Sequence, residues 1–193
     1  MRCGADVAPV RAAPSDDAEQ VTQALEGEPL ELLERRGDWA YVRTAYGYPG
    51  WVRAAAVEAG EGMLPAPTAS SPLEAASGFL GAPYEWGGMT RDGIDCSGLV
   101  HMAYRLAGQL VPRDAWQQDE AATRLGEEAA RPGDLAFYAD PGGRTDHVAF
   151  WLGDGRILHA TAREGLGTVE EDEAPELRRR RRSLGRLELT RTG

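Results

Sequence analysis

The first 60 residues alternate between short apolar and polar runs, with Gly and Pro between them. We expect extended runs at residues 7–11, 28–34 and 38–43, and a turn that leads into a further strand at 47–52. Short strands with this punctuation are typical of a small antiparallel barrel. The pattern therefore predicts a small β-barrel domain over residues 1–60.

Residues 61–71 are small, polar and rich in Pro and Ser, which predicts a linker. A helix is expected to begin directly after it. Ser71 is suited to the N-cap, Pro72 to the first helical position and Glu74 to a capping box. We expect this helix to continue to about Leu80.

Residues 72–193 change from helical to strand-like periodicity and are predicted to form one domain. Apolar residues recur at helical spacing between 96 and 107, and Gly108 is a natural stop. A further helix is predicted over residues 113–125. Strands are predicted at 134–138, 147–152, 156–160 and about 184–189. Helices followed by antiparallel strands predict an α+β fold.

The charge balance narrows the classes of partner. Among 193 residues, 21 basic side chains stand against 31 acidic ones, for a formal net charge of −10. All the basic residues are Arg, and we interpret the missing Lys and Asn as a coding bias. A chain this acidic has no general attraction to nucleic acid or to an anionic membrane. We expect neither as a partner.

No apolar run typical of a signal peptide or a membrane-spanning helix occurs in the sequence. If the chain begins at Met1, this predicts a cytoplasmic protein. The chain has 2 cysteines, Cys3 and Cys96, which excludes a disulfide scaffold. Cys3 is expected to be a terminal thiol without a role.

Cys96 is predicted to lie at the start of the second helix, where free backbone N–H groups favour a thiolate. The neighbouring Asp95 acts in the opposite direction, because a carboxylate raises the pKa of a nearby thiol. Most free cysteines are inert core residues, so the position alone does not establish a nucleophile. A nucleophilic Cys96 would need a base from elsewhere.

Histidine is the natural base, and the chain has 3 histidines. His101 lies about 140° around the helix from Cys96 and is expected to face solvent. His147 and His159 lie on consecutive predicted strands. A three-residue loop at 153–155 would place Ala149 opposite His159, with His147 as the diagonal neighbour on the same face. A two- or four-residue loop without a bulge would separate the two histidines.

Cys96, His147 and His159 then allow two chemistries. One is nucleophilic catalysis, in which His147 takes the thiol proton and His159 orients His147. The other is a zinc site, which is less favoured because cysteine-containing zinc sites usually show closely spaced ligand pairs. We therefore expect no metal and no cofactor.

Five motifs resemble the NlpC-type cysteine peptidases, and they occur in the family's order. They are Tyr84-x-Trp86-Gly87-Gly88, the Asp95-Cys96-Ser97-Gly98 segment, Arg131-Pro132-Gly133-Asp134, Asp146-His147-Val148-Ala149 and Ile157-Leu158-His159-Ala160. The resemblance covers residues 72–193, and the first 60 residues resemble a bacterial SH3-type domain. It implies a papain-like α+β domain after an SH3-like barrel.

The resemblance also implies an activity and a triad. Members of this family hydrolyse the bond between γ-D-glutamate and a diamino acid in murein peptides, and one subgroup requires a free N-terminal L-alanine. By position, Cys96 is similar to the nucleophile, His147 to the base and His159 to the third member. The implied substrate is a short L-Ala-γ-D-Glu-diamino acid peptide.

Further side chains match substrate-binding positions of the family. Asp95 and Ser97 correspond to residues that hold the α-amine, and Tyr84 to one beside the oxyanion. Trp86 is similar to a pocket wall, although core packing explains an aromatic residue equally well. Tyr48 is expected to close the pocket from the SH3-type domain, and two nearby tyrosines compete for that role.

The implied process is trimming of peptides during peptidoglycan recycling. A secreted wall hydrolase, a catalytically silent wall-binding module and acyl transfer or amidase chemistry on another substrate remain as alternatives. The acidic run at 170–173 and the arginines at 178–182 are predicted to form a solvated loop. The sequence indicates neither the diamino acid nor an oligomeric state.

Overall fold

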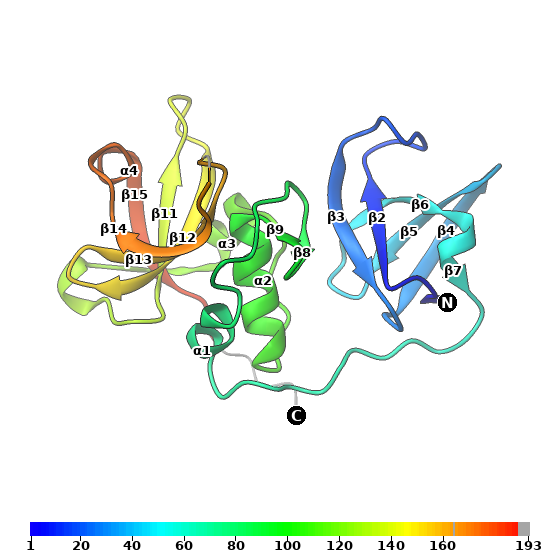
Figure 1. The fold of residues 1–193 in the computed structure, drawn as a ribbon, viewed down its shortest axis with the longest axis horizontal. Coiled ribbons are helices and arrows are strands. Elements are labelled where there is room, and N and C mark those ends of the chain that lie inside the picture. Colours follow the sequence, from blue (N-terminus) through cyan, green and yellow to red (C-terminus); the bar gives the residue numbers. More distant parts are fainter. Residues whose placement is uncertain (164, 189–193) are drawn as a thin grey trace. The chain divides into compact units, whose positions relative to one another are not determined.

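A computed structural model describes residues 1–163 and 165–188 and divides into two compact units (Figure 1). The N-terminal unit comprises residues 1–66 and 86–88, and the C-terminal unit begins at Pro67 and lacks residues 86–88. The first break, between Ala66 and Pro67, falls inside the segment 61–71 that was predicted to be a linker. Each unit has a sheet of its own.

The N-terminal unit is an antiparallel SH3-like barrel. Within the described residues its five-stranded sheet has the order β3-β2-β6-β5-β4, and β1 pairs with β7. Strand β3 was not predicted. The strands are β1 (Arg2–Cys3), β2 (Val7–Arg11), β3 (Gln20–Leu25), β4 (Leu30–Arg36), β5 (Trp39–Thr44), β6 (Pro49–Arg53) and β7 (Val57–Glu58), with a 3₁₀ turn η1 (Ala54–Ala56) before β7.

The barrel core forms by alternation along these strands. In β2, Ala8 and Val10 are buried while their neighbours are exposed or half-buried, as a strand with one face toward the core requires. Cys3 packs in the same cluster and is 1% exposed. Cys3 is therefore a small core residue rather than a loose terminal thiol.

The C-terminal unit combines helices with an antiparallel sheet, so the predicted α+β class is confirmed. Within the described residues the six-stranded sheet has the order β10-β15-β11-β12-β13-β14. Its strands are β10 (Thr123–Leu125), β11 (Leu135–Ala139), β12 (Thr145–Gly153), β13 (Arg156–Thr161), β14 (Gly167–Asp172) and β15 (Arg181–Arg186). The other elements are α1 (Pro72–Ser77), β8 (Met89–Thr90), β9 (Gly93–Ile94), α2 (Cys96–Leu106), α3 (Ala115–Ala121), η2 (Glu127–Ala129) and α4 (Pro175–Arg180).

Two helices are shorter than the sequence predicted. Helix α1 begins as expected, with the Glu74 backbone N–H donating to Oγ of Ser71 at 3.2 Å, but it ends at Ser77 instead of near Leu80. Helix α3 ends at Ala121 because Ala122 is extended and residues 123–125 pair with β15. The prediction of helix over 113–125 is wrong at both ends.

Helix α2 packs against β12 and β13 (Figure 1). Phe150 of β12 stacks on Tyr104 of α2, with ring centroids 6.4 Å apart. Every α2 residue from Cys96 to Arg105 is buried, because the helix is covered on all sides. His101 is therefore 0% exposed, contrary to the predicted solvated position, and its Nδ1 lies 2.8 Å from the Val111 carbonyl oxygen.

The arginine run forms helix and strand rather than the predicted loop. It spans α4 and the first residues of β15, and several of its guanidinium groups contact carboxylates. Arg180 contacts Asp146 at 2.5 Å, and Arg181 contacts Glu127 at 2.9 Å. These two ion pairs compensate the charges of Arg180 and Arg181.

None of the helices among the described residues is both long enough and apolar enough to cross a membrane.

Candidate active site

Cys96 is the first residue of α2, and its neighbour Asp95 forms the N-cap. The Gly98 backbone N–H donates to Oδ1 of Asp95 at 2.6 Å, which fixes the start of the helix. The backbone N–H groups of Val148 and Ser97 lie near the Cys96 sulfur and favour its thiolate, which lowers its pKa. Val148 directly follows His147, so the thiol lies beside the strand that carries this histidine.

The Cys96 thiol is protonated in the resting site. Burial, followed by the charge of Asp95, raises its pKa to about 12, although two backbone N–H groups and Arg113 act in the opposite direction. The helix N-terminus was expected to favour a thiolate, but burial outweighs it here. The thiol must therefore lose its proton to a base during nucleophilic attack.

The structure brings His147 and His159 together. Nε2 of His147 lies 2.8 Å from Nδ1 of His159, and the two rings meet edge to face. The ladder pairs Phe150 with Leu158, and the same register continued by one residue places Ala149 opposite His159. This is the diagonal arrangement that the alternation of β12 predicted.

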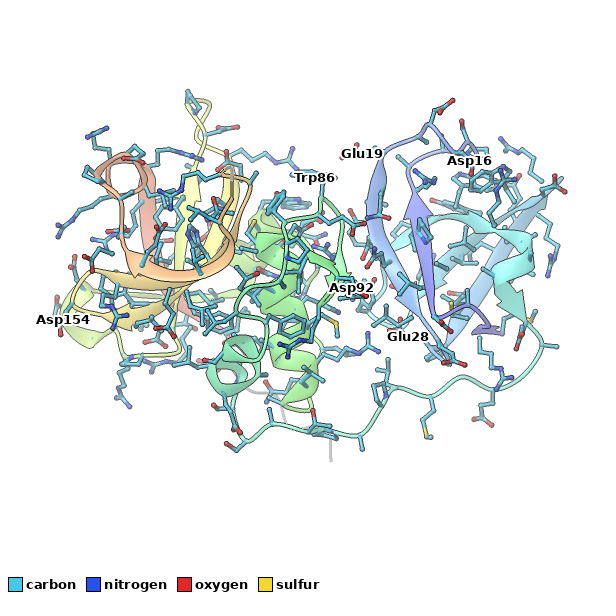
Figure 2. All side chains as sticks on the ribbon, in the orientation of Figure 1. Asp16, Glu19, Glu28, Trp86, Asp92 and Asp154 are labelled. Atoms are coloured by element: carbon cyan, nitrogen blue, oxygen red, sulfur yellow. The ribbon has the colours of Figure 1, made fainter. Side chains whose placement is uncertain are left out.

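The hairpin reaches this register by a different route from the predicted one. Gly153 pairs with Arg156, so the loop holds two residues rather than three, and Leu152 forms a bulge. Asp154 has a φ of 52° and Gly155 of 76°, as a two-residue turn with both central residues at positive φ requires. Asp154 at the tip is labelled in Figure 2. The bulge restores the shared face that a plain two-residue loop would have lost.

His147 is neutral in the resting site and ready to accept a proton. Burial, together with the nearby His159 and Arg180, lowers the pKa of His147 to about 3. Its ring lies 5.5 Å from that of Tyr138, its partner on β11. His147 is a half-buried neutral imidazole, and the backbone of the next residue, Val148, lies at the Cys96 sulfur, so His147 can serve as a general base for this thiol.

The second nitrogen of His159 binds a carboxylate that the sequence reading missed. Nε2 of His159 lies 3.0 Å from Oε1 of Glu171 in β14, and Arg163 binds the same oxygen. The run that contains Glu171 was predicted to be a solvated loop, yet it forms an edge strand. Glu171 was not predicted as a partner of His159 because strand β14 was not predicted. The sequence of the acidic run does not distinguish Glu171 from its neighbours.

Asp95 and Ser97 converge on a second residue that the sequence reading missed. Arg113 is 2% exposed, and its two terminal nitrogens bind the Asp95 carboxylate at 2.9 and 2.8 Å. One of them also donates to Oγ of Ser97 at 2.9 Å. The two side chains that were predicted to hold an α-amine therefore have a cationic partner within the protein. Arg113 also offsets the charge of Asp95 beside the thiol.

Tyr84 lies next to this cluster through a parallel bridge with Ile94. Burial raises the pKa of Tyr84, and negative charge at Cys96 and Asp95 would raise it further. Its hydroxyl therefore stays protonated as a hydrogen-bond donor. Tyr84, His147 and His159 line a cavity of about 480 Å³, as do Asp146, Arg163 and Arg180.

Two predicted substrate-binding residues belong to the N-terminal unit. Trp86, labelled in Figure 2, is 60% exposed and is grouped with residues 1–66. Tyr48 is half-buried in the turn before β6, where its backbone N–H donates to Oγ1 of Thr44 at 3.1 Å. Their contacts with substrate stay predictions.

The geometry disfavours the zinc alternative. Two nitrogens that bind the same tetrahedral zinc lie about 3.3 Å apart and both point at the metal. The histidine nitrogens instead face each other at hydrogen-bonding distance, 2.8 Å. The pair is arranged for proton transfer and orientation rather than for metal binding.

Two family models match the chain. The NlpC/P60 family model matches residues 81–179, and the model for the bacterial dipeptidyl-peptidase Sh3 domain matches residues 10–57. The first match contains Cys96, His147 and His159, and the second covers most of the barrel.

Curated relatives are named as cell-wall peptidases. A gamma-D-glutamyl-L-lysine dipeptidyl-peptidase of Bacillus cereus is 38% identical over 103 residues, which are 52% of this chain and 31% of the relative. Peptidoglycan endopeptidase RipB of Mycobacterium tuberculosis is 36% identical over 110 residues, 50% of this chain and 45% of the relative. The matches thus span less than half the length of either relative.

A solved structure of an NlpC/P60 family protein from Bacillus cereus matches with a TM-score of 0.58 and 26% identity. It covers 96% of this chain and 62% of the solved one. The RipB structure matches with a TM-score of 0.53 and 30% identity over 61% of this chain and 63% of the other. From its fold, its motifs and the matching family model, this chain belongs to the NlpC/P60 family.

Proposed function

We propose that this protein is a cysteine peptidase that hydrolyses the bond between γ-D-glutamate and a diamino acid in murein peptides. The observation that carries the proposal is the pair of histidines 2.8 Å apart, with the Cys96 sulfur near the backbone N–H of Val148, the residue after His147. A thiol, a neutral base and a group that orients the base are the parts that acyl transfer through a thioester needs.

In the first half of the reaction, the Cys96 thiol gives its proton to His147 as the sulfur attacks the γ-glutamyl carbonyl carbon. A carbon–sulfur bond forms, and the carbonyl electron pair moves to oxygen. The Tyr84 hydroxyl and the Cys96 backbone N–H are the donors we assign to that oxyanion. His147 then protonates the departing amine, the carbon–nitrogen bond breaks and the diamino acid leaves.

In the second half, water replaces the amine. His147 takes a proton from the water as its oxygen attacks the thioester carbon. When this second tetrahedral intermediate collapses, the carbon–sulfur bond breaks and the sulfur regains a proton from His147. The second half releases the dipeptide L-Ala-D-Glu with a free γ-carboxyl group and regenerates the free thiol, and the cycle needs no cofactor.

We further propose that the substrate carries a free N-terminal L-alanine, which makes the enzyme a dipeptidyl-peptidase. The support is the barrel's match to a dipeptidyl-peptidase Sh3 domain and the printed name of the Bacillus cereus relative. Ser97 and Asp95 remain our candidates for the amine. However, the bidentate contact of Asp95 with Arg113 means that an ammonium group would have to share an already compensated carboxylate.

A free L-alanine amine exists only after the stem peptide has been released from the glycan. The enzyme would therefore act downstream of an amide-cleaving reaction, which supports a role in recycling. The net charge of −10 fits an enzyme that takes free peptides rather than one that adheres to an anionic wall. We propose a cytoplasmic location on this reasoning.

The test compares L-Ala-γ-D-Glu-meso-diaminopimelate with its N-acetylated form as substrates of the full chain. We expect cleavage of the first peptide between D-Glu and the diamino acid, with kcat/KM for the acetylated form lower by at least about 100-fold. Equal rates for the two peptides would remove the amine requirement but keep the peptidase. No cleavage of either peptide, nor of the L-lysine analogue, would contradict the proposed activity.

A further inference from the structure

Glu171 completes a continuous chain of side chains that starts at the proposed base. His147 contacts His159 at 2.8 Å, and His159 contacts Glu171 at 3.0 Å. His159 is 1% exposed, and both of its ring nitrogens are used in these two contacts. Both ring nitrogens of His159 are therefore satisfied by groups of the protein itself.

The sheet register holds Glu171 in this position. In the β13–β14 ladder, His159 pairs with Val169 and Ile157 pairs with Glu171. Glu171 is thus the diagonal neighbour of His159 on the same face of the sheet. Arg163 binds the same carboxylate oxygen and restrains it from the other side. The pairing of β13 with β14 and the ion pair with Arg163 therefore hold the contact between His159 and Glu171 in place.

Glu171 is ionised at neutral pH. Burial alone would raise its pKa, but hydrogen bonds from Arg163 and His159 outweigh burial and hold the pKa below its ordinary value. An ionised carboxylate accepts hydrogen bonds and donates none. The hydrogen between Glu171 and His159 must therefore sit on Nε2 of the histidine.

The tautomer of His159 in turn determines the tautomer of His147. A neutral His159 with its hydrogen on Nε2 offers only a lone pair at Nδ1, so Nε2 of His147 must carry the hydrogen between the two rings. The Nδ1 atom of a neutral His147 is then unprotonated and available as a base. One carboxylate thus fixes the tautomers of both histidines.

We propose that Glu171 is a positioning residue that sets the tautomers of His159 and His147 and so presents Nδ1 of His147 as the base atom. The inference rests on the proposed roles of Cys96 and His147 in hydrolysis. It also explains how a histidine serves as third member of the triad. An Asp is always an acceptor, whereas a neutral His has two tautomers and needs a further group to select one.

Nitrogen-15 NMR of the full chain, labelled at histidine, tests the proposal directly at pH 7.5. The chain has 3 histidines, so assignment by single substitution is simple. His101 is an internal reference with the opposite tautomer, because its Nδ1 must donate to the Val111 carbonyl oxygen. We expect His147 and His159 to carry hydrogen on Nε2. A wild-type His159 with hydrogen on Nδ1 would overturn the proposal without any variant.

Substitutions at Glu171 give the second readout. Glu171→Gln keeps an oxygen acceptor for Nε2 of His159, so we expect the tautomers to persist and kcat to fall by less than about 10-fold. Glu171→Leu removes the acceptor, so we expect mixed tautomers at His159 and a kcat about 100-fold lower, with KM within about threefold. Wild-type kcat and unchanged tautomers in Glu171→Leu would overturn the proposal.

Glu170→Gln is the matched control. Glu170 is the exposed neighbour on the same strand, on the opposite face, where it pairs with Arg156 at 3.3 Å. We expect its kcat and histidine spectra to equal those of wild type, and an equal loss in both variants would mean that β14 acts only as a scaffold, against the proposal. The NMR readout needs no substrate, so failure of the proposed activity and failure of this inference are distinguishable.

Discussion

Nε2 of His147 and Nδ1 of His159 lie 2.8 Å apart although the two residues sit on different strands of a hairpin. Their contact depends on the bulge at Leu152, which compensates for a two-residue turn. With Leu152 paired in the ladder instead, the period of two along each strand would turn the histidines to opposite faces. The proposed reaction therefore depends on a backbone irregularity some distance from the reacting atoms.

Full activity should require the nitrogen of His159 that accepts a hydrogen bond from His147. We expect His159→Ala to lower kcat by about 10²- to 10⁴-fold, because His147 then loses the group that orients it. His159→Asn places an amide oxygen within reach of Nε2 of His147 and should recover part of this loss. The measurement is kcat and KM on the free-amine peptide. Identical kcat for the Ala variant and wild type would contradict the assignment.

Deleting Leu152 should keep the two histidines together and leave the protein active. The deletion removes the bulged residue itself and leaves a plain two-residue hairpin, in which Gly153 still pairs with Arg156 and Trp151 with Ile157, so the two histidines keep their shared face. Circular dichroism checks folding, and peptide cleavage checks function. Asp154→Asn in the same turn is the control, because Asn tolerates a φ of 52° and should keep full activity. A folded but inactive deletion variant would contradict this account of the register.

The sequence predicted the positions of Cys96, His147 and His159 in the fold well because its signals are local and periodic. The motif around Cys96 marks a helix start, and alternation along β12 assigns His147 to one face. The three-residue loop was wrong, since two residues at positive φ plus a bulge produce the same register as three loop residues. Different loop lengths can thus produce the same register at the site. The sequence predicted the register but not the length of the loop.

Residues that act through distant pairing were not predictable from the sequence. Glu171 stands in an acidic run that is typical of a solvated loop, and only its pairing with β13 distinguishes it from its neighbours. Arg113 is an isolated cation whose burial follows from its contact with Asp95. His101 was placed by helical angle alone, which cannot show that α2 is covered on every side.

The buried ion pair between Arg113 and Asp95 should contribute more to the free energy of unfolding than an exposed ion pair on the barrel. Both side chains are buried, with 1% and 8% of their side-chain area exposed, so Arg113→Met leaves an uncompensated carboxylate in the interior. We expect a loss of about 3–5 kcal/mol in the free energy of unfolding, measured by chemical denaturation. Arg43→Gln breaks the exposed pair with Glu31 and should cost far less. Equal losses would contradict the importance of burial.

The buried His101 should make stability depend on pH. Burial, followed by the charge of Arg113, lowers its pKa in the folded protein to about 3, against 6.5 as the ordinary value. The unfolded chain therefore binds more protons between these values, and stability should be full above pH 6.5 and fall as the pH drops toward 3. His147 contributes in the same direction.

His101→Asn checks this dependence. Asn keeps a donor for the Val111 carbonyl oxygen and cannot titrate in this range. Between pH 6.5 and 5, the free energy of unfolding of the variant should fall less steeply than that of wild type, by up to about 1.4 kcal/mol per pH unit. Because the comparison concerns slopes, a general destabilisation does not affect it. Equal slopes would mean that His101 is not the titrating group.

The most direct test of the central claim is hydrolysis of L-Ala-γ-D-Glu-meso-diaminopimelate by wild type, Cys96→Ala and Cys3→Ala. The two substitutions remove the chain's 2 cysteines in turn, and Cys3 lies in the barrel core. We predict that wild type and Cys3→Ala release the diamino acid at similar rates, while Cys96→Ala is slower by at least about 10³-fold. Release by Cys96→Ala at the wild-type rate would contradict nucleophilic catalysis by Cys96.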